Sequence, residues 1–404
     1  SGDLEVADFA LSISGGAAEV NATPASIAKT AQNIWVLGLT LTGGTANGSE
    51  TLTVVPAAST AIYDKAGNAA STSQSNNTAS LTEKILPTVT GVTSTTDNGS
   101  YKQGETIAIT VAFSEVVNVT GTPQLTLETG GSDAVVDYSS GTGSNTLTFN
   151  YTIGAGHTSS DLDYKATSSL GLNGGAIKDA ALNAATLTLA SPGATNSLGN
   201  SKALIVDTSV PTISGVSLNA ANTELTVTFA EDVYNTNGGS GDLEVADFAL
   251  SISGGAAEVN ATPASIAKTA QNIWVLGLTL TGGTANGSET LTVVPAASTA
   301  IYDKAGNAAS TSQSNNTASL TEKILPTVTG VTSTTDNGSY KQGETIAITV
   351  AFSEVVNVTG TPQLTLETGG SDAVVDYSSG TGSNTLTFNY TIGAGHTSSD
   401  LDYK

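Results

Sequence analysis

Acidic side chains stand at the ends of predicted strands and in the turns between them, where they could bind a metal ion. Asp207 lies in the segment VDTSVP, Glu231 and Asp232 end the run TFAED, and the turn YDKAGN carries Asp303 and Asn307. Carboxylate and amide oxygens are the ligands that Ca²⁺ takes in sets of six to eight, together with carbonyl groups and water. A cation would also neutralise charges that repel one another. These segments therefore predict a calcium site if the fold brings them together.

A second set of the same kind is less regular. The segment TEKILP carries Glu83, the run FSEVV carries Glu115, and the segment IKDAALN carries Asp179 and Asn183 but lacks the glycine of YDKAGN. This set is the weaker candidate for calcium, because Lys84 stands beside Glu83 and the turn is degenerate. Equivalent positions recur along the chain and extend the candidate ligands to three further residues: Asp64, Glu322 and Glu354.

The same residues also have an explanation without metal. A turn such as YDKAGN forms in ordinary hairpins, where Asp bonds to the backbone and Gly accepts a positive φ. A carboxylate at a strand end can simply be solvated, and the EF-hand pattern is absent from the sequence. Catalysis is less compatible still, because the chain has no Cys, no Arg and two His at one repeated position, His157 and His396. We expect no enzymatic activity.

An internal repeat sets the elements that must position these residues. Residues 1–165 recur without a difference as residues 240–404, so the repeating unit is 239 residues long. Within the unit, PTVTGV at Pro87 resembles PTISGV at Pro211. We predict two alternating domain types, B and A: part of a B domain at 1–86, an A domain at 87–209, a B domain at 210–325 and part of an A domain at 326–404. We expect the chain to be a section of a longer tandem array.

Alternation with a period of two, rich in Val, Ile and Thr, predicts β-strands throughout. Clear examples are the runs 106–113, 123–129, 145–153 and 50–56, separated by Gly, Asn and Ser clusters. Only the Ala-rich stretch 22–32 would tolerate a helical turn, and we expect Trp35 and Tyr151 in cores. The predicted fold class is all-β, with tandem immunoglobulin-like Greek-key β-sandwiches in an elongated array. Because successive strands reverse direction, the first linker and two loops of each B domain meet at one pole.

The composition excludes several partners. The chain has 12 Lys+Arg against 35 Asp+Glu and a formal net charge of −23. Such an acidic chain does not suit nucleic acid or an anionic membrane surface. No apolar run approaches the roughly 18 residues that cross a bilayer, so we expect no membrane insertion. The polar surface of Thr, Ser, Asn and Gly favours an extracellular or cell-surface location.

Longer strings carry a resemblance to a known family. GSYKQGETIAITVAFSEVVNVTGTPQLTLETG and YDKAGNAAS resemble the immunoglobulin-like, or cadherin-like, tandem repeats of giant bacterial surface adhesins. LEVADFALSISGG is similar to the related repeat named after a cyanobacterial swimming-associated surface protein. The resemblance implies spacer modules, often stiffened by calcium at their junctions. By motif match it implies that role for these ligands: Glu115, Asp179, Glu231, Asp232 and Asp303.

Three functions follow from these expectations. The first is a structural spacer or stalk of a large surface protein, whose partners are the neighbouring repeats of its own chain. The second is a subunit of a filament, sheath or surface layer that self-associates into fibres. The third is a module that binds a carbohydrate or a protein ligand through its loops, although no loop specifies a ligand.

Overall fold

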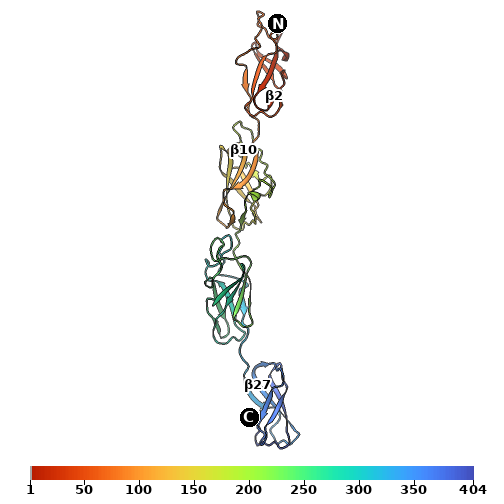
Figure 1. Cartoon of the computed structure of the whole chain (residues 1–404), viewed down its shortest axis with the longest axis vertical. Helices are drawn as coiled ribbons and strands as arrows, with labels where there is room; N and C mark the ends of the chain where they lie inside the picture. The colour runs from red at the N-terminus through yellow and green to blue at the C-terminus, as the bar shows by residue number, and fades with distance from the viewer. Residues whose placement is uncertain (1) are drawn as a thin grey trace.

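The chain is a row of four β-rich modules joined end to end, as a computed structural model of residues 2–404 shows (Figure 1). The N-terminus lies in the first module at one end of the row and the C-terminus in the fourth at the other. Among the described residues, no sheet combines strands of two modules. The protein is all-β apart from short helical turns, and none of its helices over residues 2–404 is long and apolar enough for a bilayer span.

The third module shows the type B arrangement. Antiparallel sheets of order β17-β18-β22-β21 and β19-β24-β25 enclose one core, and β20 pairs with β23 beside them. Trp274 in β22 is only 1% exposed and belongs to this core. The elements are β17 (Ile213–Leu218), β18 (Glu224–Phe229), η2 (Val245–Asp247), β19 (Phe248–Ser253), β20 (Ala257–Val259), β21 (Ser265–Ala270), β22 (Ile273–Gly277), β23 (Leu280–Gly282), β24 (Thr290–Pro295) and β25 (Thr317–Ser319).

The first module repeats the later part of this arrangement. Its sheets are β1-β6-β7, β2-β5 and β3-β4. The elements are η1 (Val6–Asp8), β1 (Phe9–Ser14), β2 (Ala18–Val20), β3 (Ser26–Ala31), β4 (Ile34–Gly38), β5 (Leu41–Gly43), β6 (Thr51–Pro56) and β7 (Thr78–Ser80).

Two expectations for the first module were wrong. The stretch 22–32 contains no helical turn, because Ser26–Ala31 pairs as β3 with β4 along its length. Trp35 is partly exposed rather than buried, although its copy Trp274 is in a core. The difference arises because β22 pairs with β18, whereas β4 pairs only with β3.

The second module shows the type A arrangement. Seven strands form one sheet of order β14-β11-β12-β13-β10-β15 with β8 paired to β10, and the parallel pair β9 and β16 lies beside it. The elements are β8 (Val89–Ser94), β9 (Gly99–Tyr101), β10 (Thr106–Thr120), β11 (Gln124–Leu127), β12 (Ala134–Ser140), β13 (Ser144–Thr152), β14 (Leu170–Gly171), β15 (Ala176–Lys178), α1 (Leu198–Ser201) and β16 (Leu204–Val206).

The fourth module repeats the earlier part of type A as one five-stranded sheet of order β26-β27-β30-β29-β28. A groove of about 560 Å³ opens beside Tyr340, at the place where β16 covers the second module. The elements are β26 (Val328–Ser333), β27 (Thr345–Val356), β28 (Gln363–Leu366), β29 (Ala373–Ser379) and β30 (Ser383–Thr391).

The alternation of side chains along each strand explains the cores. In β13, Leu147, Phe149 and Tyr151 are buried while the residues between them face outward to a greater degree. Burying a side chain of this size stabilises a fold by about 1.5–3 kcal/mol.

Asp207 and Glu231 follow the ends of strands, as expected. Glu115 instead lies inside β10, where the pairing with β13 shifts register between Ala112 and Val117.

Candidate metal centres

The clearest candidate site lies between the second and third modules, here called the A–B junction. Asp207, Glu231 and Asp303 each offer a carboxylate oxygen, and these oxygens lie within 4.8 Å of one another. We call these three residues the A–B cluster. Two oxygens bound to one Ca²⁺ at 2.3–2.6 Å are separated by at most about 5 Å. The spacing therefore fits a single ion.

Three separate segments supply the A–B cluster. Asp207 directly follows β16, and its amide donates to the carbonyl of Tyr101 at 2.9 Å. Glu231 follows the end of β18, and Asp303 opens the turn of residues 303–307 next to an isolated bridge between Tyr234 and Tyr302. The alternating direction of the strands thus brings residues almost one hundred positions apart in sequence to one pole.

Asn307 holds the A–B cluster together. Its backbone amide and its Nδ2 each donate to Asp303, both at 2.7 Å, and Nδ2 also donates to the carbonyl of Asp207 at 2.9 Å. Asp303 is only 1% exposed, so the turn is fixed inside the junction. The side-chain amide therefore connects the turn of the third module to the linker that precedes this module.

The charges of the A–B cluster repel one another. Burial, followed by the charges of Asp303, Asp207 and Asp232, raises the pKa of Glu231 to about 7. Burial also raises the pKa of Asp303, against the opposing effect of its hydrogen bonds from Asn307. A divalent cation at this place would offset the repulsion. Three carboxylates, with carbonyl groups and water, are the oxygen donor set that Ca²⁺ binds.

A matching cluster lies between the first and second modules, at the B–A junction. The carboxylate oxygens of Glu83, Glu115 and Asp179 also lie within 4.8 Å of one another, and we call these residues the B–A cluster. Asn183 donates from Nδ2 to Glu83 Oε2 at 2.7 Å and to Asp179 Oδ2 at 2.8 Å. The B–A cluster therefore has the same plan: a linker carboxylate, a strand glutamate and an aspartate in a turn.

The turn of the B–A cluster is regular despite its missing glycine. The bonds from Asn183 to Asp179 match those from Asn307 to Asp303, with distances of 2.8 Å in place of 2.7 Å. Leu182 occupies the glycine position with a φ of 71° and is 74% exposed. The degenerate turn therefore still forms, with the strain of a positive φ placed on Leu182.

Burial, neighbouring charges and hydrogen bonds shift the pKa values of Glu115 and Asp179 in the B–A cluster in opposite directions. Burial, then the charges of Glu83 and Asp179, raises the pKa of Glu115. Burial opposes ionisation of Asp179, but the hydrogen bonds from Asn183 outweigh it and hold the pKa of Asp179 below its usual range. A cation at this cluster would favour the charged form of Glu115.

The remaining candidate ligands lie outside both clusters. Asp232 is exposed beside Glu231 and acts on it only through its charge. Asp64 is the residue of the first module that is equivalent to Asp303, and it accepts the same bonds from Asn68. It is exposed and belongs to neither cluster. Among residues 2–404, Glu322 and Glu354 have no third carboxylate within cluster distance, and Glu354 Oε1 is buried without a hydrogen-bond partner.

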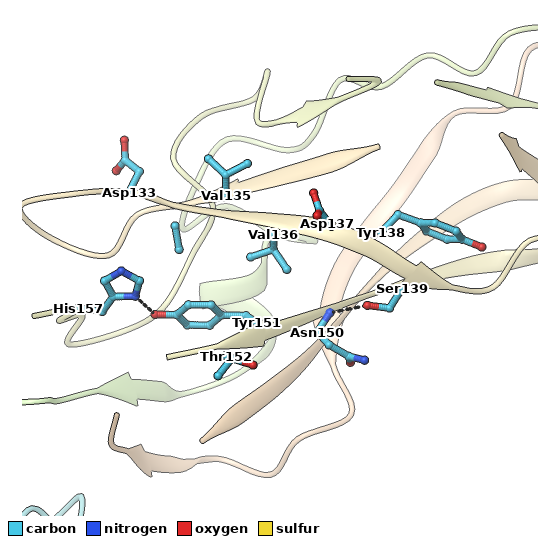
Figure 2. A pocket seen from close by; sticks show the side chains of 11 residues that line it. Asp133, Val135, Val136, Asp137, Tyr138, Ser139, Asn150, Tyr151, Thr152 and His157 are labelled. Atoms are coloured by element: carbon cyan, nitrogen blue, oxygen red, sulfur yellow. Dashed lines mark hydrogen bonds between the residues drawn. The ribbon is translucent and has the colours of Figure 1, made fainter. Parts of the chain in front are cut away.

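An open groove of about 510 Å³ on the second module lies over β12 and β13 (Figure 2). The Tyr151 hydroxyl bonds to His157 Nδ1 at 2.8 Å, and the amide of Asn150 donates to Ser139 Oγ at 3.1 Å. Burial raises the pKa of Tyr151 to about 12, so its hydroxyl stays protonated at neutral pH. Other polar groups of this groove bond to neighbours outside it; Asp137, for example, accepts from Gln124 Nε2 at 2.8 Å.

Sequence reasoning missed one residue at the A–B junction. Lys102, in the turn between β9 and β10, donates from Nζ to the carbonyl of Gly306 at 2.8 Å and to Asn237 Oδ1 at 3.1 Å. Both partners belong to the third module, more than one hundred residues away in sequence. No motif around Lys102 could have indicated them, because the contact depends on how two modules are oriented.

Comparisons with known proteins do not establish a family for this chain. No family model matches it, and no curated protein matches it. A solved structure of domains 1–6 of the surface layer protein SbsC is 12% identical, with a TM-score of 0.22, over 79% of this chain and 53% of that one. The crystal structure of the S-layer protein rSbsC(31-844) is also 12% identical, with a TM-score of 0.18, over 79% and 54%. The chain spans about half the length of these two proteins, and the scores are too low to establish a common fold.

Proposed function

We propose that the chain is a structural, non-enzymatic spacer of an extracellular surface protein. Its modules act as tandem immunoglobulin-like Greek-key sandwiches that extend the protein in a row, and Ca²⁺ stiffens the junctions between them. The observation that carries this proposal is the recurrence of one acidic cluster at two successive junctions. Each cluster joins a linker carboxylate to two carboxylates of the module that follows.

The mechanical role follows from the position of the clusters. A junction between domains that bury little surface moves by default. Binding one ion to the linker and to the following module at once removes that freedom, because the ligands of both parts share one coordination sphere. The row of modules seen in Figure 1 would then behave as a stiff stalk.

Calcium titration of the full chain tests the proposal. We expect two binding events by isothermal titration calorimetry, and in chelator a lower melting temperature and a smaller radius of gyration in solution scattering. The double variant Glu231→Gln/Glu115→Gln should bind no calcium. The variant Asp232→Asn/Asp64→Asn, which removes as much charge outside the clusters, should bind it as before. Identical scattering and melting curves with calcium and with chelator would refute the stiffening role.

A further inference from the structure

The two kinds of junction differ in one direct contact between modules. At the A–B junction, the Lys102 ammonium of the second module bonds to Gly306 and Asn237 of the third. The other hydrogen bonds across this junction involve the linker, such as that from Asn307 to Asp207. Lys102 therefore ties two folded bodies to each other without using the linker or the acidic cluster.

The B–A junction has no equivalent of this contact over residues 2–404. There, Asn183 bonds to Glu83 of the linker, at the carbonyl and at the carboxylate. The residue equivalent to Gly306 is Leu182, whose side chain is largely exposed. Apart from the acidic cluster, the side-chain hydrogen bonds at this junction over residues 2–404 all involve the linker.

Glycine at position 306 leaves room for the contact. A Cβ there would lie 2.1 Å from Asn237 Oδ1 and 3.2 Å from Lys102 Nζ. At the same position of the first module, Gly67, a Cβ would meet nothing within 4 Å. The glycine of the B turn therefore has a packing reason at the A–B junction that is absent elsewhere.

We propose that Lys102 makes the A–B junction a joint that stays fixed without a cation, so that withdrawal of Ca²⁺ loosens the B–A junction that carries a cluster and leaves the A–B junction fixed. This inference rests on the proposed cation-stiffened stalk. The rigid element in the absence of calcium is then the A–B pair, and the chain bends once in each repeating unit of 239 residues.

Single-molecule energy transfer between introduced cysteines tests both junctions separately, since the chain has no Cys of its own. The variant Ser12→Cys/Ser140→Cys spans the B–A junction, and Ser140→Cys/Ser251→Cys spans the A–B junction. Ser12 and Ser251 are the same exposed position in the two copies of type B. On addition of chelator, we expect the B–A distribution of transfer efficiencies to become roughly twice as wide, since relative motion is the default across a small interface. The A–B distribution should keep its width.

Lys102→Met should then widen the A–B distribution in chelator to the width of the B–A distribution. Lys341→Met is the matched control, because Lys341 is the identical residue in the fourth module and its ammonium has no hydrogen-bond partner among the described residues. Gly306→Ala should act as Lys102→Met does, and Gly67→Ala should not. Equal widening of both junctions in chelator with Lys102 intact would overturn the inference, as would an unchanged A–B distribution in Lys102→Met.

The outcomes separate this inference from the proposed function. If chelator changes neither junction but Lys102→Met widens the A–B distribution, the contact stands and the stiffening by calcium fails. If chelator widens the B–A distribution and Lys102→Met has no effect, the calcium role stands and the inference fails.

Discussion

Replacing Glu231 by Gln removes a carboxylate whose charged form is disfavoured by burial and by repulsion within the A–B cluster. The pKa of Glu231 is raised from 4.5 to about 7, chiefly by burial and then by the charges of its acidic neighbours. A pKa difference of this size corresponds to roughly 3 kcal/mol between the two protonation states. Solvent screening at this half-buried position reduces the effect to roughly 1–2 kcal/mol.

The sign follows from the direction of the pKa change. The folded state binds the Glu231 proton more tightly than the unfolded state, so its contribution is complete below about pH 4.5 and is lost as the pH rises to 7. In chelator at pH 8, Glu231→Gln should therefore raise the unfolding free energy of the third module by roughly 1–2 kcal/mol. At pH 4.5 the variant and the parent should be equally stable. With calcium, the parent should gain stability and the variant should gain less.

Urea unfolding followed by tryptophan fluorescence measures this effect in the full chain. The chain has two Trp, and Trp35→Phe leaves Trp274, in the core of the third module, as the single reporter. Asp232→Asn is the control, because it removes an equal charge from an exposed neighbour outside the cluster. A Glu231→Gln variant that is less stable than its parent in chelator at pH 8 would show that the carboxylate stabilises the junction by itself, against the reasoning above.

Three further predictions concern single residues. Leu182→Gly should stabilise the second module by about 1 kcal/mol, because glycine accepts the positive φ that strains leucine. Hydrogen exchange of the β13 amides measures the change in stability, and faster exchange in the variant would contradict the prediction. Burial opposes ionisation of Glu289, but hydrogen bonds from backbone amides such as that of Ala257 hold its pKa low. The carboxylate therefore stabilises the third module at neutral pH, and this stabilisation is lost as the pH falls below 4.5. Glu289→Gln should destabilise the module at pH 7 and make its stability, followed by Trp274 fluorescence, less sensitive to acid. Asn307→Ala should lower both the melting temperature and the calcium affinity at the A–B junction, and an unchanged calorimetric titration would show that its bonds do not organise the cluster.

Much of the secondary structure could be predicted from the sequence because it depends on local alternation. The expected strand at 145–153 is β13 over Ser144–Thr152, and that at 50–56 is β6 over Thr51–Pro56. The gathering of Asp207, Glu231 and Asp303 at one pole also follows from strand direction, and the structure places them together. Their role as calcium ligands stays a prediction.

Other features depend on contacts that a single sequence does not specify. The exposure of Trp35 depends on which strands pair with β4, and the same sequence around Trp274 is buried. The regular turn at Leu182 depends on bonds to Asp179 that outweigh the preference of leucine for negative φ. The bonds of Lys102 require two modules in a fixed orientation, which neither module encodes by itself.

The alternation of two module types has a consequence for how such a chain is made. Residues 1–86 of the first module recur as residues 240–325 of the third, but a module with a different strand order separates them. Neighbouring domains of identical sequence are prone to exchange strands during synthesis and refolding. Here each module lies beside one whose strands are arranged in a different order. Alternation of two strand orders therefore keeps modules of matching sequence apart and reduces the opportunity for strand exchange between neighbours.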